Sequence, residues 1–341
     1  MRGQLQMKIL LFCSLFVFLS ISAQASDLEH IGGSTMGTTY SVKYRQNKTK
    51  IDREQLKLAI DKALELVNDL ASTYRKNSEI SRFNRHTSQA PMKVHPKFAS
   101  WVKLSKDIHH ASDGAFDITM NSLVELWGFG AKDIPKQVPT DQQITSLLDQ
   151  RHIDKVLVDI NKSTLAKKIP SVQIDLSGVA KGAGVDDVAE LLESKAITDY
   201  MVEIGGEIRT SGTKAAGQAW VIAIEKPVES GRKVQKLLRL NHEAMATSGN
   251  YRNFFESNGK RYSHILDPMT GRPITHYLAS VTVIAKNCAE ADAFATAFMV
   301  LGTKRSLAVA KAKGLHAYFI ERRHGRFEFF ETQGFSQKVL K

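Results

Sequence analysis

Cysteine is scarce in this sequence: its 341 residues include only Cys13 and Cys288. Cys13 lies in an N-terminal segment that we expect to be removed, so the mature chain would keep one cysteine and form no internal disulfide. Stability must then come from a hydrophobic core. With 43% hydrophobic residues, the chain is long and apolar enough to bury a large one.

The apolar run over residues 9–21 is too short to cross a bilayer comfortably, which takes about 20 residues. Two basic residues precede it, and the small-x-small sequence Ala-Gln-Ala follows at residues 23–25. This arrangement is typical of a cleavable signal peptide. We therefore expect a signal peptide over residues 1–25 and a secreted or periplasmic functional domain over residues 26–341. The cysteine in the run lacks the small preceding residue of a lipoprotein signal, so we expect no lipid anchor.

Acidic residues are outnumbered, 35 against 47 lysines and arginines, which gives a net charge of +12. Loss of the signal peptide removes Arg2 and Lys8 and no acidic residue, leaving +10. Such an excess attracts anionic surfaces. No basic run is interleaved with aromatic residues as in nucleic-acid recognition modules, so we expect solvated surface lysines and no nucleic-acid partner.

Residues 175–186 are rich in glycine, yet they contain neither a P-loop nor a complete Rossmann fingerprint. A predicted strand over residues 172–176 leads into this segment, and a helical pattern follows Gly178. The free N–H groups at a helix N-terminus favour an anion. Lys181 adds a positive charge one turn later, and Asp175 adds a hydrogen-bond acceptor. This combination predicts a site for a nucleotide-like ligand.

Helical and strand-like patterns are largely segregated along the chain. Helical periodicity begins at Asp52, and further helices are expected over residues 97–110, after Gly178, and over residues 289–313. Strands are expected over residues 38–44, 200–204, 208–211, 220–224, 234–240, 242–247, 252–256, 262–266 and 278–285. Consecutive strands with turn-length links predict the α+β class, with largely antiparallel sheets and packed helices.

Asp292 and Thr296 are four residues apart in the last predicted helix, so they share one face. A carboxylate and a hydroxyl are hard oxygen ligands suited to Mg²⁺. Alternatively, Asp292 only favours the helix N-terminus and Thr296 packs in the core. The surrounding residues are apolar, so a carboxylate there requires a partner.

Two other polar segments are candidate sites. His264 lies between Ser263 and Asp267, just before a turn that Pro268 stabilises. A single histidine is more often an ordinary surface or core residue, and this alternative stays open. Residues 113–119 form a predicted turn with two carboxylates and an aromatic residue, although the turn alone also explains them.

Eight segments in this order resemble the ApbE family, the FAD:protein FMN transferases, over nearly all of the chain after residue 25. They are residues 35–38, 72–74 with 81–84, 114–117, 175–182, 202–207, 247–249, 263–268 with 270–271, and 291–293. The resemblance implies an ApbE-like, T-fold-like architecture. It also implies transfer of the FMN moiety of FAD to a threonine or serine hydroxyl of an acceptor flavoprotein, with release of AMP and use of Mg²⁺.

The family motifs imply roles for particular residues. FAD would contact Met36, Tyr74, Ala115, Phe116, Asp117, Asp175, Lys181, His264 and Ile265. The carbonyl of Gly178 and the side chains of Asp292 and Thr296 would hold the metal. The implied partners are flavin-carrying subunits of membrane redox complexes, of the NADH:quinone reductase or Rnf type, or periplasmic flavoprotein reductases.

His264 is our candidate for the base that accepts the proton of the acceptor hydroxyl, because imidazole titrates near neutral pH. Two alternatives remain. One is an Mg²⁺-dependent FAD pyrophosphatase, in which water replaces the hydroxyl. The other is a non-catalytic periplasmic FAD-binding protein, because Ala295 stands where some relatives carry an aspartate.

Overall fold

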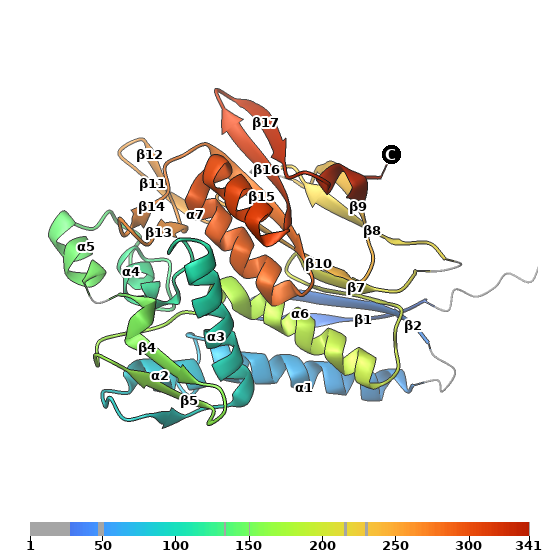
Figure 1. The fold of residues 1–341 in the computed structure, drawn as a ribbon, viewed down its shortest axis with the longest axis horizontal. Helices are drawn as coiled ribbons and strands as arrows, with labels where there is room; N and C mark the ends of the chain where they lie inside the picture. Colours follow the sequence, from blue (N-terminus) through green and yellow to red (C-terminus); the bar gives the residue numbers. More distant parts are fainter. Residues whose placement is uncertain are drawn as a thin grey trace, which may run out of the picture.

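The computed structural model describes residues 28–46, 51–132, 134–149, 151–214, 217–228 and 231–340 (Figure 1). The predicted signal peptide lies outside the described residues. Within these ranges, no helix has both the length and the apolar composition needed to cross a membrane.

An eight-stranded antiparallel sheet forms the centre of the fold, in the order β1-β2-β6-β7-β10-β15-β16-β17. Its strands are β1 (Leu28–Thr35), β2 (Thr38–Arg45), β6 (Tyr200–Ile204), β7 (Glu207–Ser211), β10 (Glu243–Gly249), β15 (Leu278–Ala285), β16 (His316–Arg323) and β17 (Arg326–Glu331). The predicted antiparallel α+β class is therefore confirmed.

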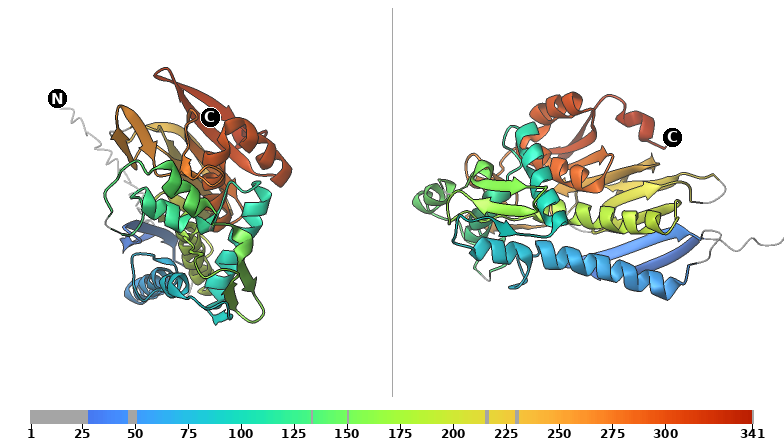
Figure 2. Two further views of the ribbon diagram at one scale, coloured as in Figure 1. Left: turned by 90° about the vertical axis from the view of Figure 1, so that its left-hand side faces the viewer. Right: turned by 60° about the horizontal axis from the view of Figure 1, so that its bottom comes forward.

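Three helices lie side by side over one face of this sheet: α1 (Arg53–Ala71), α6 (Ser177–Ser194) and α7 (Cys288–Lys313) (Figures 1 and 2). The hairpin of β8 (Trp220–Glu225) and β9 (Val234–Leu240) and the short η3 (Phe335–Lys338) cover the opposite face. Strand alternation explains the two layers, because Val281 and Val283 join the core under the helices and Ile284 joins the core under the hairpin. Every residue of β15 is consequently buried.

Smaller elements gather at one end of the sheet (Figure 1). They are α2 (Glu79–Arg85), α3 (Pro96–Ala111), α4 (Asn121–Leu126), α5 (Asp141–Leu148), η1 (Ile118–Met120), η2 (Ile153–Lys155), the sheet of β3 (Met92–Lys93), β5 (Thr164–Lys167) and β4 (Val156–Asp159), and the hairpins of β11 (Phe254–Ser257) with β12 (Lys260–Ser263) and β13 (Leu266–Asp267) with β14 (Arg272–Pro273). An aromatic cluster around Trp127 packs α4 and α5 against these hairpins. The hairpins carry the segment that contains His264.

Three predicted elements differ from the structure. Residues 172–176 are extended but form no strand, because the side chain of Asn84 bonds both main-chain groups of Ile174, each at 2.8 Å, in place of a neighbouring strand. The predicted strand over residues 262–266 breaks at His264, where β12 has ended and β13 has not begun. The last helix has its predicted length, but Gly302, with φ 71° and ψ 166°, divides it by a kink.

Asp186 of α6 fixes the start of α7. Its carboxylate accepts the N–H groups of Cys288 and Ala289, both at 2.9 Å, and pairs with Arg209 at 3.0 Å. These amides belong to the first turn of α7, where N–H groups have no hydrogen-bond acceptor within the helix. The contact therefore sets the position of α7 relative to α6.

Asp186→Asn should lower the free energy of unfolding by about 2–3 kcal/mol. The NH₂ group of the asparagine side chain would face a buried main-chain N–H, and the charge-assisted hydrogen bonds of the carboxylate would be lost. Urea denaturation measures the loss. Asp107→Asn is the control, since Asp107 is an exposed partner of Lys103 and such pairs contribute about 0–1 kcal/mol. Equal stability losses in the two variants would contradict the assignment.

Candidate functional site

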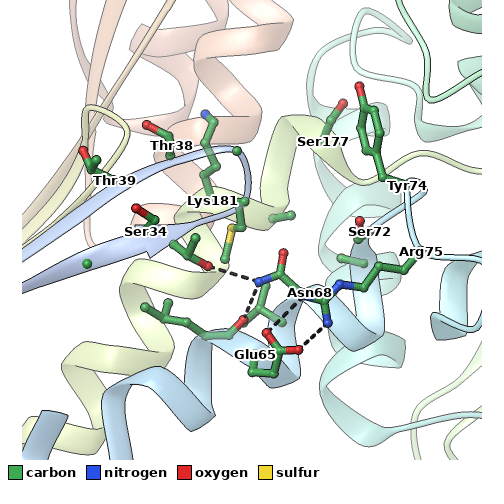
Figure 3. A pocket seen from close by; sticks show the side chains of 18 of the residues that line it. Ser34, Thr38, Thr39, Glu65, Asn68, Ser72, Tyr74, Arg75, Ser177 and Lys181 are labelled. Carbon is green, nitrogen blue, oxygen red and sulfur yellow. Dashed lines mark hydrogen bonds and ion pairs between the residues drawn. The ribbon is translucent and has the colours of Figure 1, made fainter. Parts of the chain in front are cut away.

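The predicted site residues line two neighbouring cavities. The smaller, about 450 Å³, lies where α6, α7, β7 and the His264 segment meet. Its lining includes Ala115, Phe116, Asp117, Asp175, Gly178, Lys181, His264, Ile265, Asp292 and Thr296. The larger, about 1200 Å³, is lined by Met36 and Tyr74, and it shares Asp175, Ser177 and Lys181 with the smaller one (Figure 3). The structure thus brings all the predicted residues around one place, centred on Lys181.

Lys181 reaches from α6 into a pair of buried carboxylates. Its Nζ lies 2.7 Å from Oε1 of Glu207 and 3.8 Å from Oδ1 of Asp292. Burial alone lowers the pKa of Lys181, but these two carboxylates outweigh it and hold the pKa above its ordinary value. The ammonium therefore remains charged at neutral pH, next to the first turn of a helix, which suits an anion such as phosphate.

Gly178, Asp292 and Thr296 converge on the same wall. A Cβ on Gly178 would lie 3.3 Å from Oγ1 of Thr296 and 2.9 Å from the Phe116 ring, so a side chain here would require the Phe116 ring to shift. The amide of Gly182 donates to Oδ2 of Asp292 at 3.1 Å. In a regular helix this amide would donate to the carbonyl of Gly178. A carbonyl oxygen has two lone pairs, so that of Gly178 remains available to a ligand.

The described residues contain no group of three or more His, Cys, Asp or Glu side chains that could hold a metal. A cation at this wall would therefore have one carboxylate, a hydroxyl and a carbonyl as its protein ligands. These are hard oxygen donors, which suit Mg²⁺ when phosphate oxygens complete the shell.

His264 has a defined orientation. Its Nδ1 lies 3.0 Å from the carbonyl oxygen of Asn253, which also accepts the His264 amide at 3.1 Å. A carbonyl only accepts, so Nδ1 carries the proton and Nε2 keeps a lone pair. Burial lowers the pKa of His264 below its usual value, and the charges of Lys181 and Lys136 add to this effect. The imidazole is consequently neutral at neutral pH and can accept a proton.

Asp117 is a buried carboxylate in the wall of the smaller cavity. Its Oδ1 accepts the amide and hydroxyl of Thr119 at 2.8 and 2.6 Å, whereas its buried Oδ2 has no hydrogen-bond partner and lies 3.7 Å from Arg151. Burying a carboxylate oxygen without a partner is unfavourable. The ion pair with Arg151 offsets this cost, and because the Asp117 side chain has no exposed surface, it forms part of the wall of the smaller cavity.

Asp175 lies beside Asp117 because its amide donates to the carbonyl of Ile118 at 2.7 Å. Its Oδ1 accepts the amide of Ser177 at 2.7 Å, which fixes the carboxylate at the start of α6. Burial raises the pKa of Asp175, and the hydrogen bond from Ser177 partly opposes this. Asp175 and Ser177 are therefore held in a wall that the two cavities share.

Glu207 and Ser248 also lie at the site, although sequence analysis predicted no role for either residue. Burial raises the pKa of Glu207 to about 7 against the effect of Lys181, and its Oε2 is buried without a hydrogen-bond partner. Ser248 lies 3.4 Å from the Thr296 hydroxyl. Both belong to segments that carried the family resemblance, which was the available signal, but strand periodicity does not show what either side chain faces.

Comparisons with known proteins agree with this arrangement. A model of the ApbE family matches residues 36–319. The FAD:protein FMN transferase of Vibrio cholerae is 46% identical over 312 residues, covering 92% of this chain and 93% of its own length.

Solved structures match equally broadly. The flavin transferase ApbE from Vibrio cholerae is 44% identical with a TM-score of 0.85, covering 91% of this chain and 99% of that one. The apo flavinyl transferase ApbE of Pseudomonas stutzeri is 35% identical with a TM-score of 0.84, covering 91% and 96%. The chain therefore belongs to the ApbE family, and it is an enzyme that transfers the FMN moiety of FAD to a protein.

Proposed function

We propose that the transfer is Mg²⁺-dependent and takes place where the two cavities meet, with the FAD pyrophosphate held beside Lys181. The observation that carries this proposal is that Asp175, Ser177 and Lys181 line both cavities. A dinucleotide extends to both sides of its pyrophosphate, so it needs two spaces joined at a cationic point. Lys181 and the N-terminus of α6 provide that point.

The adenosine half occupies the smaller cavity in this arrangement. There Ala115, Phe116 and Ile265 supply an apolar surface for the base. The flavin half extends into the larger cavity, where Met36 and the ring of Tyr74, 74% exposed, are free to pack against it.

The reaction is a phosphoryl substitution. The oxygen of an acceptor threonine or serine forms a bond to the phosphorus of the FMN half, and the bond from that phosphorus to the bridging oxygen breaks. AMP leaves with the bridging oxygen and its electron pair, while the hydroxyl proton passes to Nε2 of His264. Lys181 stabilises the charge on the phosphates, and such electrostatic stabilisation supplies most of the catalysis in phosphoryl transfer.

The donor set of Gly178, Asp292 and Thr296 supports the magnesium proposal. Mg²⁺ prefers hard oxygen ligands and keeps several positions for substrate oxygens and water. When bound, it neutralises charge on the phosphates. The two side chains that would hold it are already oriented: Asp292 accepts the Gly182 amide, and the Thr296 hydroxyl lies 3.4 Å from that of Ser248.

Asp292→Ala should abolish FMN transfer at low Mg²⁺ and recover partly when Mg²⁺ is raised. The concentration for half-maximal activity should rise by about 100-fold or more, because loss of a ligand costs more than loss of an outer-shell partner. Titration of activity with MgCl₂ measures this. Glu290→Ala, two residues earlier on α7, is the matched control. If Asp292→Ala had the same Mg²⁺ dependence as the wild type, Asp292 would not be a metal ligand.

The proposed acceptors are flavin-carrying subunits of membrane redox complexes, of the NADH:quinone reductase or Rnf type, or periplasmic flavoprotein reductases. We place the reaction in the periplasm, after cleavage near residue 25. The support is the signal-peptide pattern, and N-terminal sequencing of the exported protein tests it.

The direct test incubates the mature protein with FAD, Mg²⁺ and a candidate acceptor domain, and measures the mass of the acceptor. Attached FMN that is lost when the acceptor threonine is replaced supports the proposal. Free FMN and AMP without attachment would instead indicate the pyrophosphatase activity, and unchanged FAD would indicate a binding protein.

A further inference from the structure

The larger cavity borders the edge of the central sheet. β1 is the outermost strand and pairs only with β2 among the described elements. Its last residues, 33–35, line the cavity together with Lys181 and one side of α1 (Figure 3). The edge of β1 therefore ends next to the proposed reaction centre.

The turn between β1 and β2 determines which main-chain groups of β1 point away from β2. Met36 and Gly37, with φ 50° and 72°, form a two-residue turn of the primed type. Thr35 and Thr38, which flank this turn, are therefore the pair that exchanges hydrogen bonds. Because such pairs alternate, the N–H and C=O of Ser34, and of every second residue before it, point outward.

Two observed contacts agree with this alternation. On β2, the partner of Ser34 is Thr39, and its carbonyl accepts the amide of Gly205 on the side away from β1, at 3.1 Å. On β1, the carbonyl of His30 accepts the guanidinium of Arg53 at 3.0 Å from outside the sheet. Between residues 30 and 34, the outward groups of β1 are thus at His30, Gly32 and Ser34.

The edge is covered at one end and open at the other. Arg53 occupies the His30 carbonyl, but no described residue bonds to the main-chain groups of Gly32 or Ser34. Ser34 is exposed, and Gly32 has no side chain to keep another backbone away. Unpaired edge groups of this kind are a template for an added strand.

We propose that the acceptor protein binds by adding an extended segment to β1 at Gly32 and Ser34. This inference rests on the proposed function, because a pyrophosphate at Lys181, which lines both cavities, is within reach of a segment that enters this one. Main-chain pairing supplies affinity and orientation while the side chains of the segment remain free, so one of them can carry the reactive hydroxyl.

The size of the cavity supports a polypeptide occupant. Its volume of about 1200 Å³ exceeds the roughly 300–1,000 Å³ of most sites for a single small ligand. Residues 33–35 of the β1 edge line this cavity. Because the transfer of FMN requires a protein substrate to reach this site, the proposed occupant is a segment of that protein.

Amide hydrogen exchange tests the contact without any chemistry. The FAD-free protein is mixed with a purified acceptor domain that the wild-type enzyme flavinylates, and exchange is followed at Gly32 and Ser34. Both amides should exchange more slowly with the acceptor present, whereas the amides of Thr35 and Gly33, which already bond to β2, should change little. Unaltered exchange at Gly32 and Ser34 would overturn the proposal.

Ser34→Pro provides the kinetic test. It removes an outward N–H and leaves the bonds to β2 intact, as proline does on edge strands. KM for the acceptor should rise about 5- to 10-fold, as expected for loss of one main-chain hydrogen bond. FAD affinity should change much less than this KM. Ser34→Ala, which keeps the N–H, and His30→Pro, which makes the same change at the covered end, should both retain the wild-type KM.

A wild-type KM for Ser34→Pro, or an equal rise in His30→Pro, would refute the strand-addition model. Thermal unfolding and FAD titration show whether Ser34→Pro is folded, and the exchange experiment on the wild type is independent of that variant. Measurements of FAD turnover test the magnesium and His264 assignments, whereas amide protection tests strand addition. The two proposals can therefore fail separately.

Discussion

Replacing His264 by alanine should lower kcat for FMN transfer by about 100- to 10,000-fold, the usual contribution of a general base. The imidazole is held with Nδ1 toward the Asn253 carbonyl, so only Nε2 can accept the hydroxyl proton. Asp117, Lys181 and the α6 N-terminus remain in the variant. FAD affinity, measured by titration, should therefore change far less than kcat.

The pH dependence distinguishes a base from a residue that only shapes the cavity. Burial, Lys181 and Lys136 lower the pKa of His264, so kcat/KM should fall on the acid side only below pH 6.5, as the imidazole becomes protonated. Lys136→Gln removes one lowering charge, and the acid limb should move to higher pH. Lys132→Gln makes the same charge change nearby and should leave the limb in place. An unchanged kcat in His264→Ala would exclude His264 as the base.

Local sequence patterns predicted most elements of this fold but not their contacts. Helical periodicity placed α1 correctly, because Asp52 caps it and its buried residues recur at helical spacing. The same periodicity could not reveal the kink at Gly302 in α7. Apolar residues 172–176 resembled a strand, because a pattern shows that a segment is extended and buried, not whether its partner is a strand or the side chain of Asn84.

The candidate site depended on tertiary contacts that no local pattern contains. Lys181 and Asp292 are far apart in the sequence, and only the packing of α6 against α7 brings their side chains within 3.8 Å. Spacing suggested Asp292 and Thr296 as a pair, but their pairing with Gly178 came from the family resemblance. Glu207 had no predicted role, because its burial against Lys181 follows from the position of β7 in the sheet.

The crossing of α6 and α7 therefore controls both stability and the site, and Gly182 lies at this crossing. A Cβ at residue 182 would lie 2.7 Å from Cα of Ala289 and closer still to the carbonyl of Cys288. These are backbone atoms of the first turn of α7, so they move only if the whole helix moves. Asp292, which accepts the Gly182 amide, is one turn further along the same helix.

Gly182→Ala should thus lower the free energy of unfolding by about 3 kcal/mol, at the upper end for an overpacked core, even though alanine is the better helix former. Gly184→Ala is the matched control in the same helix. There the nearest atom is the mobile end of Met36, at 2.7 Å, so the variant should remain within about 1 kcal/mol of the wild type. Urea denaturation measures both. Because α7 must shift to admit the new methyl group, Gly182→Ala should also require more Mg²⁺ for activity. Equal stability of the two variants would show that the crossing of α6 and α7 tolerates a side chain.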